Sequence, residues 1–320
     1  METEELRELA TIDGSDGWTD IEKHFPEPRY VPDQNKHKTG VILIPPRREK
    51  PLPPSLKMYT LKKDGKPMLL RTRSIEDFEE ECRLASFADR IFRDGGAYLS
   101  SPSEVGAYLD DTRVYSLYTY FGGDNLAKRL PELYIPQQHA LGVEAGKQLA
   151  KLQSVLPQED DTPLPNEDIF MLLTRLGEKG ITYNGYPQAE TFMKNHSAIV
   201  NGRPVTALHG DFSANTLFID NDLNVGIQPL TEVKWGDPVR DLTSLSDGYS
   251  LPFIKGVFKG LYEGAPPKDF FELLAYYSTV HALTDIDTAK DNAELATAIT
   301  RAEKLAADMD NYQSIVPVWY

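Results

Sequence analysis

Cysteine is almost missing from this 320-residue chain, because Cys82 is the only one. A single cysteine excludes an intramolecular disulfide framework and a zinc site built from cysteines. Long apolar runs are missing too, since no stretch approaches the roughly 18 consecutive apolar residues of a membrane-spanning helix. Acidic residues stand near the amino terminus, where a secretory signal has basic ones. We therefore expect a cytoplasmic protein that makes no contact with a membrane.

Basic residues are also fewer than acidic residues. The chain has 34 Lys and Arg against 49 Asp and Glu, which gives a net charge of −15 and a pI of about 4.9. A field of this sign repels the phosphate backbone of nucleic acids and anionic lipid headgroups. We therefore expect no nucleic-acid partner, and a small molecule of cationic character is the more natural ligand.

The composition is that of a globular protein, with 40% hydrophobic and 26% charged residues. At roughly 150 residues per domain, this length allows about two domains. Prolines are concentrated near the beginning, where eight of the 23 lie between Pro26 and Pro54. Proline at this density blocks helices and sheet interiors. Residues 1–56 are therefore predicted to be a Pro-rich N-terminal extension with irregular structure.

A change of hydrophobic period divides the rest of the chain into two parts. Residues 57–124 predict two strands around Asp64-Gly65, an amphipathic helix, two further strands and a break at a glycine pair. Helical periods dominate 125–320, except in 205–241, which predicts short strands around loops. The expected fold class is α+β with two lobes, a small sheet-rich N-lobe at 57–124 and a larger, mainly helical C-lobe at 125–320. The predicted C-lobe helices start near 137 and cover 167–178, 187–200, 268–283 and 289–311.

The strongest motif is His209-Gly210-Asp211 in HGDFSANT, followed by LFIDNDLNVG, IQPL and WGDPVRDL. In this order and spacing, the segments resemble the catalytic region of the aminoglycoside phosphotransferases, which reads H-G-D-x-x-x-x-N, then I-D-F, then W-G-D-P-x-x-D-L. These enzymes are relatives of choline kinase and, more distantly, of protein kinases. The resemblance extends from about residue 57 to the end of the chain. It implies a bilobal protein-kinase-like fold that uses ATP and Mg²⁺ to phosphorylate a hydroxyl of a small molecule.

The resemblance also implies roles for residues of the motif. Asp211 takes the position of the catalytic carboxylate, and His209 of the same loop is the second expected catalytic residue. Asp237 and Asp241, both in WGDPVRDL, take positions that support the catalytic loop through hydrogen bonds. Phosphoryl transfer depends on positioning and electrostatics, so a carboxylate that orients the attacking hydroxyl suits this chemistry.

On the nucleotide side, the resemblance places Arg71 where the family has its phosphate-binding lysine. An arginine offers a fork of donors instead of a point charge. Glu81 is the acid that would pair with Arg71, although the two glutamates before it are alternatives. Tyr118 and Tyr120, in the connecting segment LYTYFGGDNL, complete the expected nucleotide-binding residues.

Three parts of the expected nucleotide and metal site depart from the family pattern. The magnesium-binding asparagine falls on Thr216, with Asn215 one residue early, and the aspartate of I-D-F falls on Pro229. Proline has no side-chain oxygen for a metal. Asp220 or Glu232 are alternative ligands nearby in the sequence. The segment EKPLPPSL, before residue 57, has no glycine to form a phosphate-binding loop.

Two functions follow from these observations. The first is ATP-dependent phosphoryl transfer to a small molecule, with Asp211 as the base and Arg71 on the phosphates. The second is a catalytically silent, kinase-like protein that binds or regulates. Loss of the metal carboxylate favours the second function, because the metal provides much of the charge neutralisation in this reaction. Retention of the HGD loop and Arg71 favours the first.

Overall fold

The computed structural model describes residues 57–63, 66–100, 102–107, 113–119, 124–214, 216–220, 222–228, 230, 232–245, 249–263, 265–318 and 320. The Pro-rich segment 1–56 and the turn at Asp64-Gly65 lie outside the described residues. Tyr120, Asn215 and Pro229 lie outside them as well, so their predicted roles stay predictions. The chain forms two compact units, which are residues 1–125 with 217–233, and residues 126–216 with 234–320.

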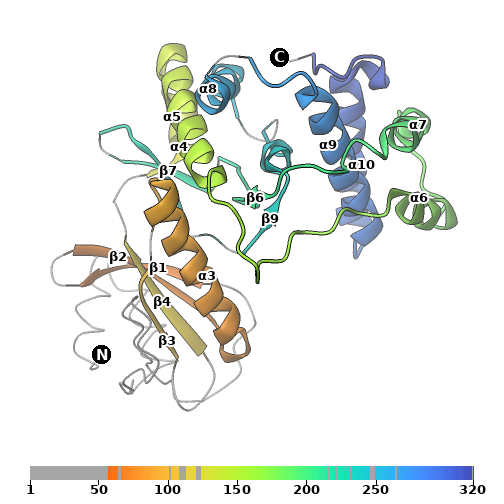
Figure 1. Ribbon diagram of the computed structural model, residues 1–320. Helices are drawn as coiled ribbons and strands as arrows, with labels where there is room; N and C mark the ends of the chain where they lie inside the picture. The colour runs from red at the N-terminus through yellow and green to blue at the C-terminus, as the bar shows by residue number, and fades with distance from the viewer. Residues whose placement is uncertain are drawn as a thin grey trace. The chain divides into compact units, whose positions relative to one another are not determined.

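The first unit is built on a four-stranded antiparallel sheet of order β1-β2-β4-β3 (Figure 1). Its strands are β1 (Lys57–Lys63), β2 (Lys66–Ser74), β3 (Pro102–Ala107) and β4 (Arg113–Thr119). Val114, Ser116 and Tyr118 alternate along β4 and are all buried, as the two-residue period of a strand requires. The register sets Arg71 of β2 opposite Ser116 of β4. The predicted pair of strands around Asp64-Gly65 is present as β1 and β2.

A helix packs on this sheet. A 3-10 turn, η2 (Ile75–Asp77), leads into α3 (Phe78–Arg90), which continues into a π-helical turn, η3 (Ile91–Gly95). Leu84, Ala88 and Ile91 lie three and four residues apart and have no exposed surface. This spacing places them on one helical face, which contacts β3 and β4.

A second, three-stranded sheet belongs to the same unit. It has the order β5-β7-β8 and consists of β5 (Asp124–Asn125), β7 (Leu217–Ile219) and β8 (Val225–Ile227). The Ile227 N–H donates to the Tyr98 carbonyl at 2.9 Å, and the Ser100 N–H donates to the Ile227 carbonyl at 2.9 Å. These long-range bonds explain why 217–233 falls in the first compact unit, whereas the sequence placed the whole of 205–241 in the C-lobe.

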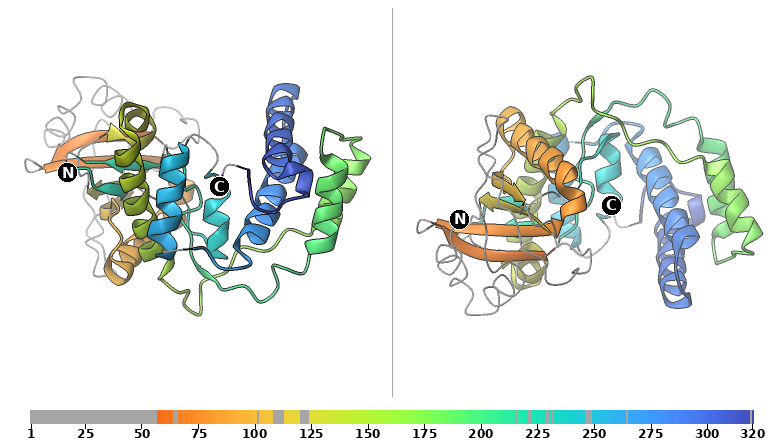
Figure 2. Two further views of the ribbon diagram at one scale, coloured as in Figure 1. Left: turned by 90° about the horizontal axis from the view of Figure 1, so that it is seen from above. Right: turned by 90° about the horizontal axis from the view of Figure 1, so that it is seen from below.

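The second unit is mainly helical and is organised around a close pair of helices, α5 (Ile135–Gln153) and α8 (Leu251–Tyr262). The two helices lie side by side in both views of Figure 2. Gly142 of α5 faces the backbone of α8, and Gly256 of α8 faces the backbone of α5. A Cβ on Gly256 would collide with the His139 carbonyl oxygen. The contact therefore depends on glycine at these positions.

The remaining elements of the second unit are α4 (Leu126–Arg129), η4 (Leu130–Glu132), α6 (Ile169–Glu178), α7 (Tyr186–His196), β6 (Thr206–Ala207), β9 (Trp235–Gly236), η5 (Pro238–Leu242), α9 (Phe270–Thr288), α10 (Asn292–Asp308) and η6 (Asp310–Tyr312). Among these elements, α6, α7 and α10 pack against α9.

The predicted α+β fold class is confirmed. Helix α8 was not predicted, although Ser250 accepts a hydrogen bond at its start and proline stands in its first turn. No helix in the described part of the chain is long and apolar enough to cross a membrane.

Candidate functional site

The HGD loop lies in the helical unit and leaves β6, which pairs with β9. The Leu208 N–H donates to the Lys234 carbonyl at 2.9 Å and extends this pairing to the start of the loop. The loop itself is held by one carboxylate. Asp241 accepts the backbone N–H of His209 at 3.0 Å and that of Gly210 at 2.8 Å. Gln153, from the end of α5, donates to the same carboxylate at 2.9 Å.

Gly210 gives the loop its shape. Its φ of +85° lies in the left-handed region, and a Cβ there would stand 2.7 Å from Cδ of Lys234. Residues other than glycine rarely adopt this φ. The turn leaves the His209 side chain buried and the Asp211 side chain exposed. The catalytic carboxylate implied by the sequence is therefore accessible from solvent.

The buried His209 side chain bonds within its own loop, and its expected catalytic role stays a prediction. Its Nδ1 accepts the N–H of Asp211 at 3.2 Å, so this nitrogen carries no proton and the ring is neutral. Burial lowers the pKa of His209, against the opposing effect of the Asp241 charge. Burial likewise raises the pKa of Asp241, against the stabilising effects of His209 and the loop N–H groups. Phe212 packs edge-on against the His209 ring, 5.7 Å between centroids.

Thr216, at the family's asparagine position, closes the loop from its far end. Its hydroxyl lies 2.6 Å from the Asp211 carbonyl and 2.9 Å from the Ser213 carbonyl. The same oxygen accepts the Ser213 N–H at 3.3 Å. A hydroxyl has one proton and two acceptor lone pairs, so these contacts occupy much of what Thr216 could offer to a metal.

Asp237 is buried in a separate network of the same unit. It accepts from Nε of Arg203 at 2.6 Å and from the Tyr277 hydroxyl at 3.3 Å. It also caps the short helix η5 by accepting the Val239 N–H at 3.0 Å. These contacts fix the start of η5, the element that carries Asp241. They are the contacts expected of a supporting residue.

Arg71 lies in the sheet unit and is fully buried, at 0% exposure, beside Glu81 of α3 at 1%. Nη2 of Arg71 lies 3.3 Å from Oε2 of Glu81, so the expected pair is present and neither neighbouring glutamate replaces it. Arg73 also lies 3.3 Å from the same oxygen. Ser116 and Tyr118 donate to Oε1 of Glu81, the latter at 3.1 Å. Burial lowers the pKa of Arg71 and raises that of Tyr118.

The other side of the Arg71 guanidinium faces the segment after β8. Nη1 of Arg71 donates to the carbonyl oxygen of Leu230, which the family alignment places last in the I-D-F segment. The cation in the lysine position is therefore bound to an acid and to the backbone of its own unit. Because Arg71 has no exposed surface, its guanidinium cannot contact a phosphate group in this arrangement.

The described oxygen donors do not fit a magnesium site. Asp220 accepts the N–H groups of Asp222 and Asn224, each at 2.9 Å, and the Tyr98 hydroxyl at 3.3 Å. Glu232 is exposed. Among the described residues, no group of three or more His, Cys, Asp and Glu side chains could hold a metal ion. Asn215 and Pro229 lie outside the described part of the chain.

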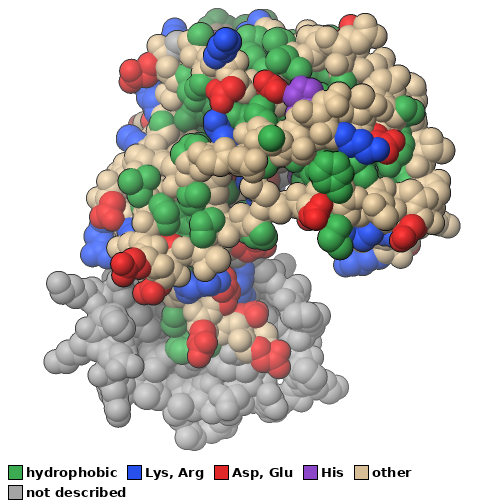
Figure 3. Space-filling model, turned by 45° about the vertical axis from the view of Figure 1, so that its right-hand side comes forward, with side chains coloured by type: hydrophobic (Ala, Val, Ile, Leu, Met, Phe, Trp, Pro, Cys, Tyr) green, Lys and Arg blue, Asp and Glu red, His purple; other side chains and the backbone are tan. Residues whose placement is uncertain are grey.

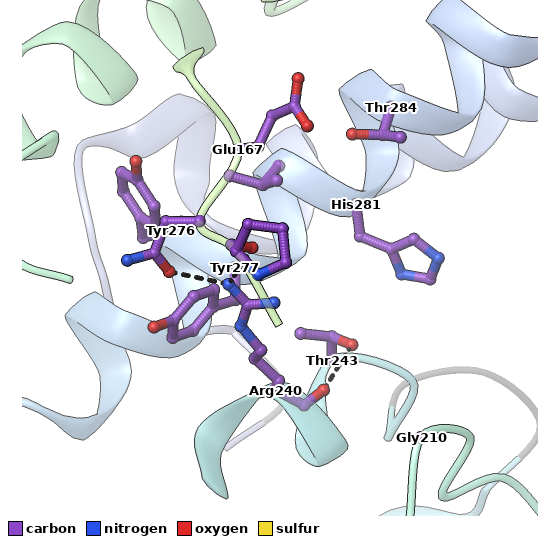
Figure 4. A pocket seen from close by; sticks show the side chains of 11 residues that line it. Glu167, Gly210, Arg240, Thr243, Tyr276, Tyr277, His281 and Thr284 are labelled. Atoms are coloured by element: carbon purple, nitrogen blue, oxygen red, sulfur yellow. Dashed lines mark hydrogen bonds between the residues drawn. The ribbon is translucent and has the colours of Figure 1, made fainter. Parts of the chain in front are cut away.

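A pocket of about 270 Å³ opens beside the HGD loop in the helical unit. Figure 4 shows Arg240 of η5 reaching toward Tyr277 of α9, with Thr243 beside it and Gly210 at the edge. His281 also lines the pocket. These residues carry no recognisable signal in the sequence, because Arg240 stands at an unspecified position of the motif and α9 carries no motif at all.

Comparison with known proteins identifies the family. Residues 55–266 match the phosphotransferase enzyme family, and the chain belongs to that family. The predicted resemblance is therefore confirmed. No curated protein matches the chain significantly.

Solved structures of phosphotransferases share the kinase-like fold. One is the GDP complex of wild-type aminoglycoside 2'-phosphotransferase-IIIa, with TM-score 0.59, 12% identity, and coverage of 81% of this chain and 92% of that one. Another is the ternary complex of APH(2'')-IIa with streptomycin and ATP, with TM-score 0.56, 16% identity, and coverage of 91% and 96%. A third is a fructosamine-3-kinase from Haemophilus somnus, described as putative, with TM-score 0.53, 12% identity, and coverage of 78% and 87%.

Proposed function

We propose that the chain transfers a phosphoryl group from a nucleotide such as ATP to a hydroxyl of a small molecule. The observation that carries this proposal is the exposure of the Asp211 carboxylate on a fixed loop. Its carboxylate is exposed at the turn of a loop whose backbone is fixed by Asp241, and the same loop lines a pocket of small-molecule size. The fold shared with solved nucleotide complexes supports a nucleotide donor.

In the proposed step, the acceptor hydroxyl donates a hydrogen bond to Asp211, which orients its oxygen toward the γ-phosphorus. The new oxygen–phosphorus bond forms as the bond from phosphorus to the leaving nucleoside diphosphate breaks, and the hydroxyl proton passes to the Asp211 carboxylate. Asp241 and Gly210 keep the loop in place, so that no reorganisation is needed during transfer. No step depends on a metal held by the protein.

A second function is favoured by a separate observation. Arg71 is fully buried and is bound to Glu81 and to the Leu230 carbonyl, so the phosphate-binding cation of the family has become part of the core. A chain with this change could bind a small molecule beside Asp211 without phosphorylating it. The two functions differ in one result, which is whether product forms.

Product formation should be measured by phosphorus NMR with ATP, Mg²⁺ and a panel of streptomycin, gentamicin, sorbitol and gluconate. Asp211→Asn should lower turnover by about 10²- to 10⁴-fold, the usual contribution of a positioned acid or base. Asp160→Asn, at an exposed residue of the same unit, is the matched control and should change nothing. Product formation that survives Asp211→Asn contradicts the mechanism, and no product from the wild type with any acceptor supports the silent function.

A further inference from the structure

The pocket beside the HGD loop has a charge pattern that differs from that of the whole chain. The chain carries a net charge of −15, yet one carboxylate, Glu167, lines this pocket in the described structure. That carboxylate is already paired, because Nη2 of Arg175 lies 3.0 Å from its Oε1. Acidic and basic side chains are interspersed on the face seen in Figure 3. The net charge therefore does not predict the charge inside the pocket.

Arg240 is the cation of the pocket. Nη2 of Arg240 donates to the Pro165 carbonyl at 3.2 Å and to Oδ1 of Asn166 at 2.8 Å. No carboxylate of the described residues lies within ion-pair distance of Arg240. Its guanidinium carbon stands 5.0 Å from the centre of the Tyr277 ring, an arrangement that holds a cation in place. The guanidinium also interacts with the Tyr277 hydroxyl, and because Arg240 lines the pocket, its fork can meet a ligand there.

The rest of the pocket is suited to hydroxyl groups. Thr243 and Thr284 line it with hydroxyls, and Tyr276 provides a buried aromatic wall. His281 lies 3.7 Å from Asp285, in reach of an ion pair when protonated. Among the described lining residues, a polycationic ligand would meet the already paired carboxylate of Glu167 and the positive charge of Arg240. A guanidinium fork matches a carboxylate through two parallel hydrogen bonds.

We propose that this pocket binds a small hydroxylated molecule that carries one carboxylate, which Arg240 recognises. This inference rests on the proposed function, because it names the chemical class of the acceptor. It replaces the cationic ligand that the net charge favours. Since Arg240 and Gly210 line the same cavity, a ligand anchored at Arg240 lies beside the loop that carries Asp211.

Three probes with the same six-carbon polyol chain isolate the effect of charge. They are gluconate, with a terminal carboxylate, sorbitol, with a terminal hydroxyl, and D-glucamine, with a terminal ammonium. Binding should be measured by calorimetry on the full chain without nucleotide. We expect gluconate to bind at least about tenfold more tightly than glucamine, with sorbitol weaker than gluconate. Equal or tighter binding of glucamine, or no binding of gluconate, overturns the proposal.

Variants of the pocket test whether Arg240 binds the carboxylate of gluconate. Arg240→Met should weaken gluconate binding by about tenfold or more, and Arg240→Lys, which keeps the charge but loses the fork, should weaken it less. Arg129→Met, at the end of α4 and outside the pocket lining, is the matched control and should bind as the wild type does. Thr284→Asp adds a carboxylate to the pocket without changing Arg240 and should favour glucamine. Circular dichroism should show that each variant is folded. Unchanged gluconate binding by folded Arg240→Met, or an unchanged probe order in Thr284→Asp, contradicts the proposal.

The two proposals fail separately. If gluconate binds through Arg240 but ATP yields no phosphorylated product, the phosphoryl transfer is wrong and the ligand class stands. If product forms with streptomycin or gentamicin and not with gluconate, the transfer stands and the ligand class is wrong.

Discussion

The HGD loop of the helical unit and the Arg71 network of the sheet unit come from the same family pattern, but they have changed to different extents. The loop keeps its backbone hydrogen bonds to Asp241 and leaves Asp211 exposed. In the sheet unit, Arg71 keeps its acidic partner Glu81 but has no exposed surface. A backbone geometry held by several bonds tolerates substitution around it, whereas a phosphate contact depends on one accessible side chain. This difference supports our proposal that the acceptor side of the family site is retained and the nucleotide side is altered.

The largest effect is expected at the ion pair of the sheet unit. Glu81→Ala leaves Arg71 buried without its acid and close to Arg73, and should lower the free energy of unfolding by about 3–5 kcal/mol. The double variant Arg71→Met, Glu81→Leu replaces the pair by apolar side chains and should recover most of that loss. Urea unfolding of both variants measures these energies. A small loss for Glu81→Ala would show that the pair does not hold the unit together.

A second large effect is expected in the helical unit, where α5 supplies Gln153 to Asp241 and packs on α8. Gly256→Ala should destabilise the chain by about 1–3 kcal/mol, because its Cβ would overlap backbone of α5. Gly177→Ala, in α6 with open space around it, is the control and should stabilise by up to about 1 kcal/mol through helix propensity. Thermal unfolding of the two variants and the wild type measures these changes in stability. Equal effects at both sites would contradict the close packing.

A carboxylate placed at the I-D-F position tests the predicted loss of a metal ligand there. Pro229→Asp returns an acid to the I-D-F position and should tighten ATP binding in the presence of Mg²⁺ by about tenfold, since carboxylate oxygens suit Mg²⁺. Pro267→Asp, at an exposed proline, adds the same charge elsewhere and controls for it. Calorimetric titrations with and without Mg²⁺ give the comparison. If Pro229→Asp binds no better than the parent, the alignment of the I-D-F segment is wrong.

The smallest effect is a pH dependence of the loop. Burial lowers the pKa of His209 below 6.5, so near this pH the unfolded chain binds more protons than the folded chain. Stability should therefore fall as the pH decreases below about 6.5. His209→Gln removes this contribution, so the stability advantage of the wild type should shrink between neutral pH and about pH 5.5. His139→Gln, on α5, is the control, and a constant difference across this range for His209→Gln would contradict the buried neutral ring.

The raised pKa of Asp241 acts in the opposite direction at lower pH, because the folded chain then takes up protons before the unfolded one. His209 and Asp241 influence each other's pKa. The difference between the two proteins at each pH therefore reports the coupled pair.

Much of the fold followed from periodicity, and the exceptions have physical reasons. Helix α8 was missed because Gly256 and Gly260 interrupt its apolar pattern, and glycine in a sequence suggests a break. In the structure these glycines allow the backbones of α5 and α8 to meet. The segment 217–233 was assigned to the helical lobe because nothing in the sequence shows that Ile227 pairs with Leu99. Both features depend on long-range contacts.

The candidate site likewise has parts that the sequence predicted and parts that depend on long-range packing. The motif located Asp211, and the structure shows the backbone bonds by which Asp241 holds that loop. The family pattern also suggested the pairing of Arg71 with Glu81. The burial of Arg71 and its bond to the Leu230 carbonyl could not be predicted, since they depend on how separate segments pack. The pocket around Arg240 was equally hidden, because a variable position gives no signal in one sequence.

Thermal unfolding of the wild type with ATP, measured with and without Mg²⁺, tests the altered nucleotide side most directly. A ligand at a hundred times its dissociation constant raises the free energy of unfolding by about 2.7 kcal/mol. Because Arg71 is buried and the family pattern places Pro229 at a metal-ligand position, we predict a small shift in the unfolding temperature that is nearly the same with and without Mg²⁺. A shift of several degrees that appears only with Mg²⁺ would contradict this account, since it would require a metal-bridged nucleotide site in the folded chain.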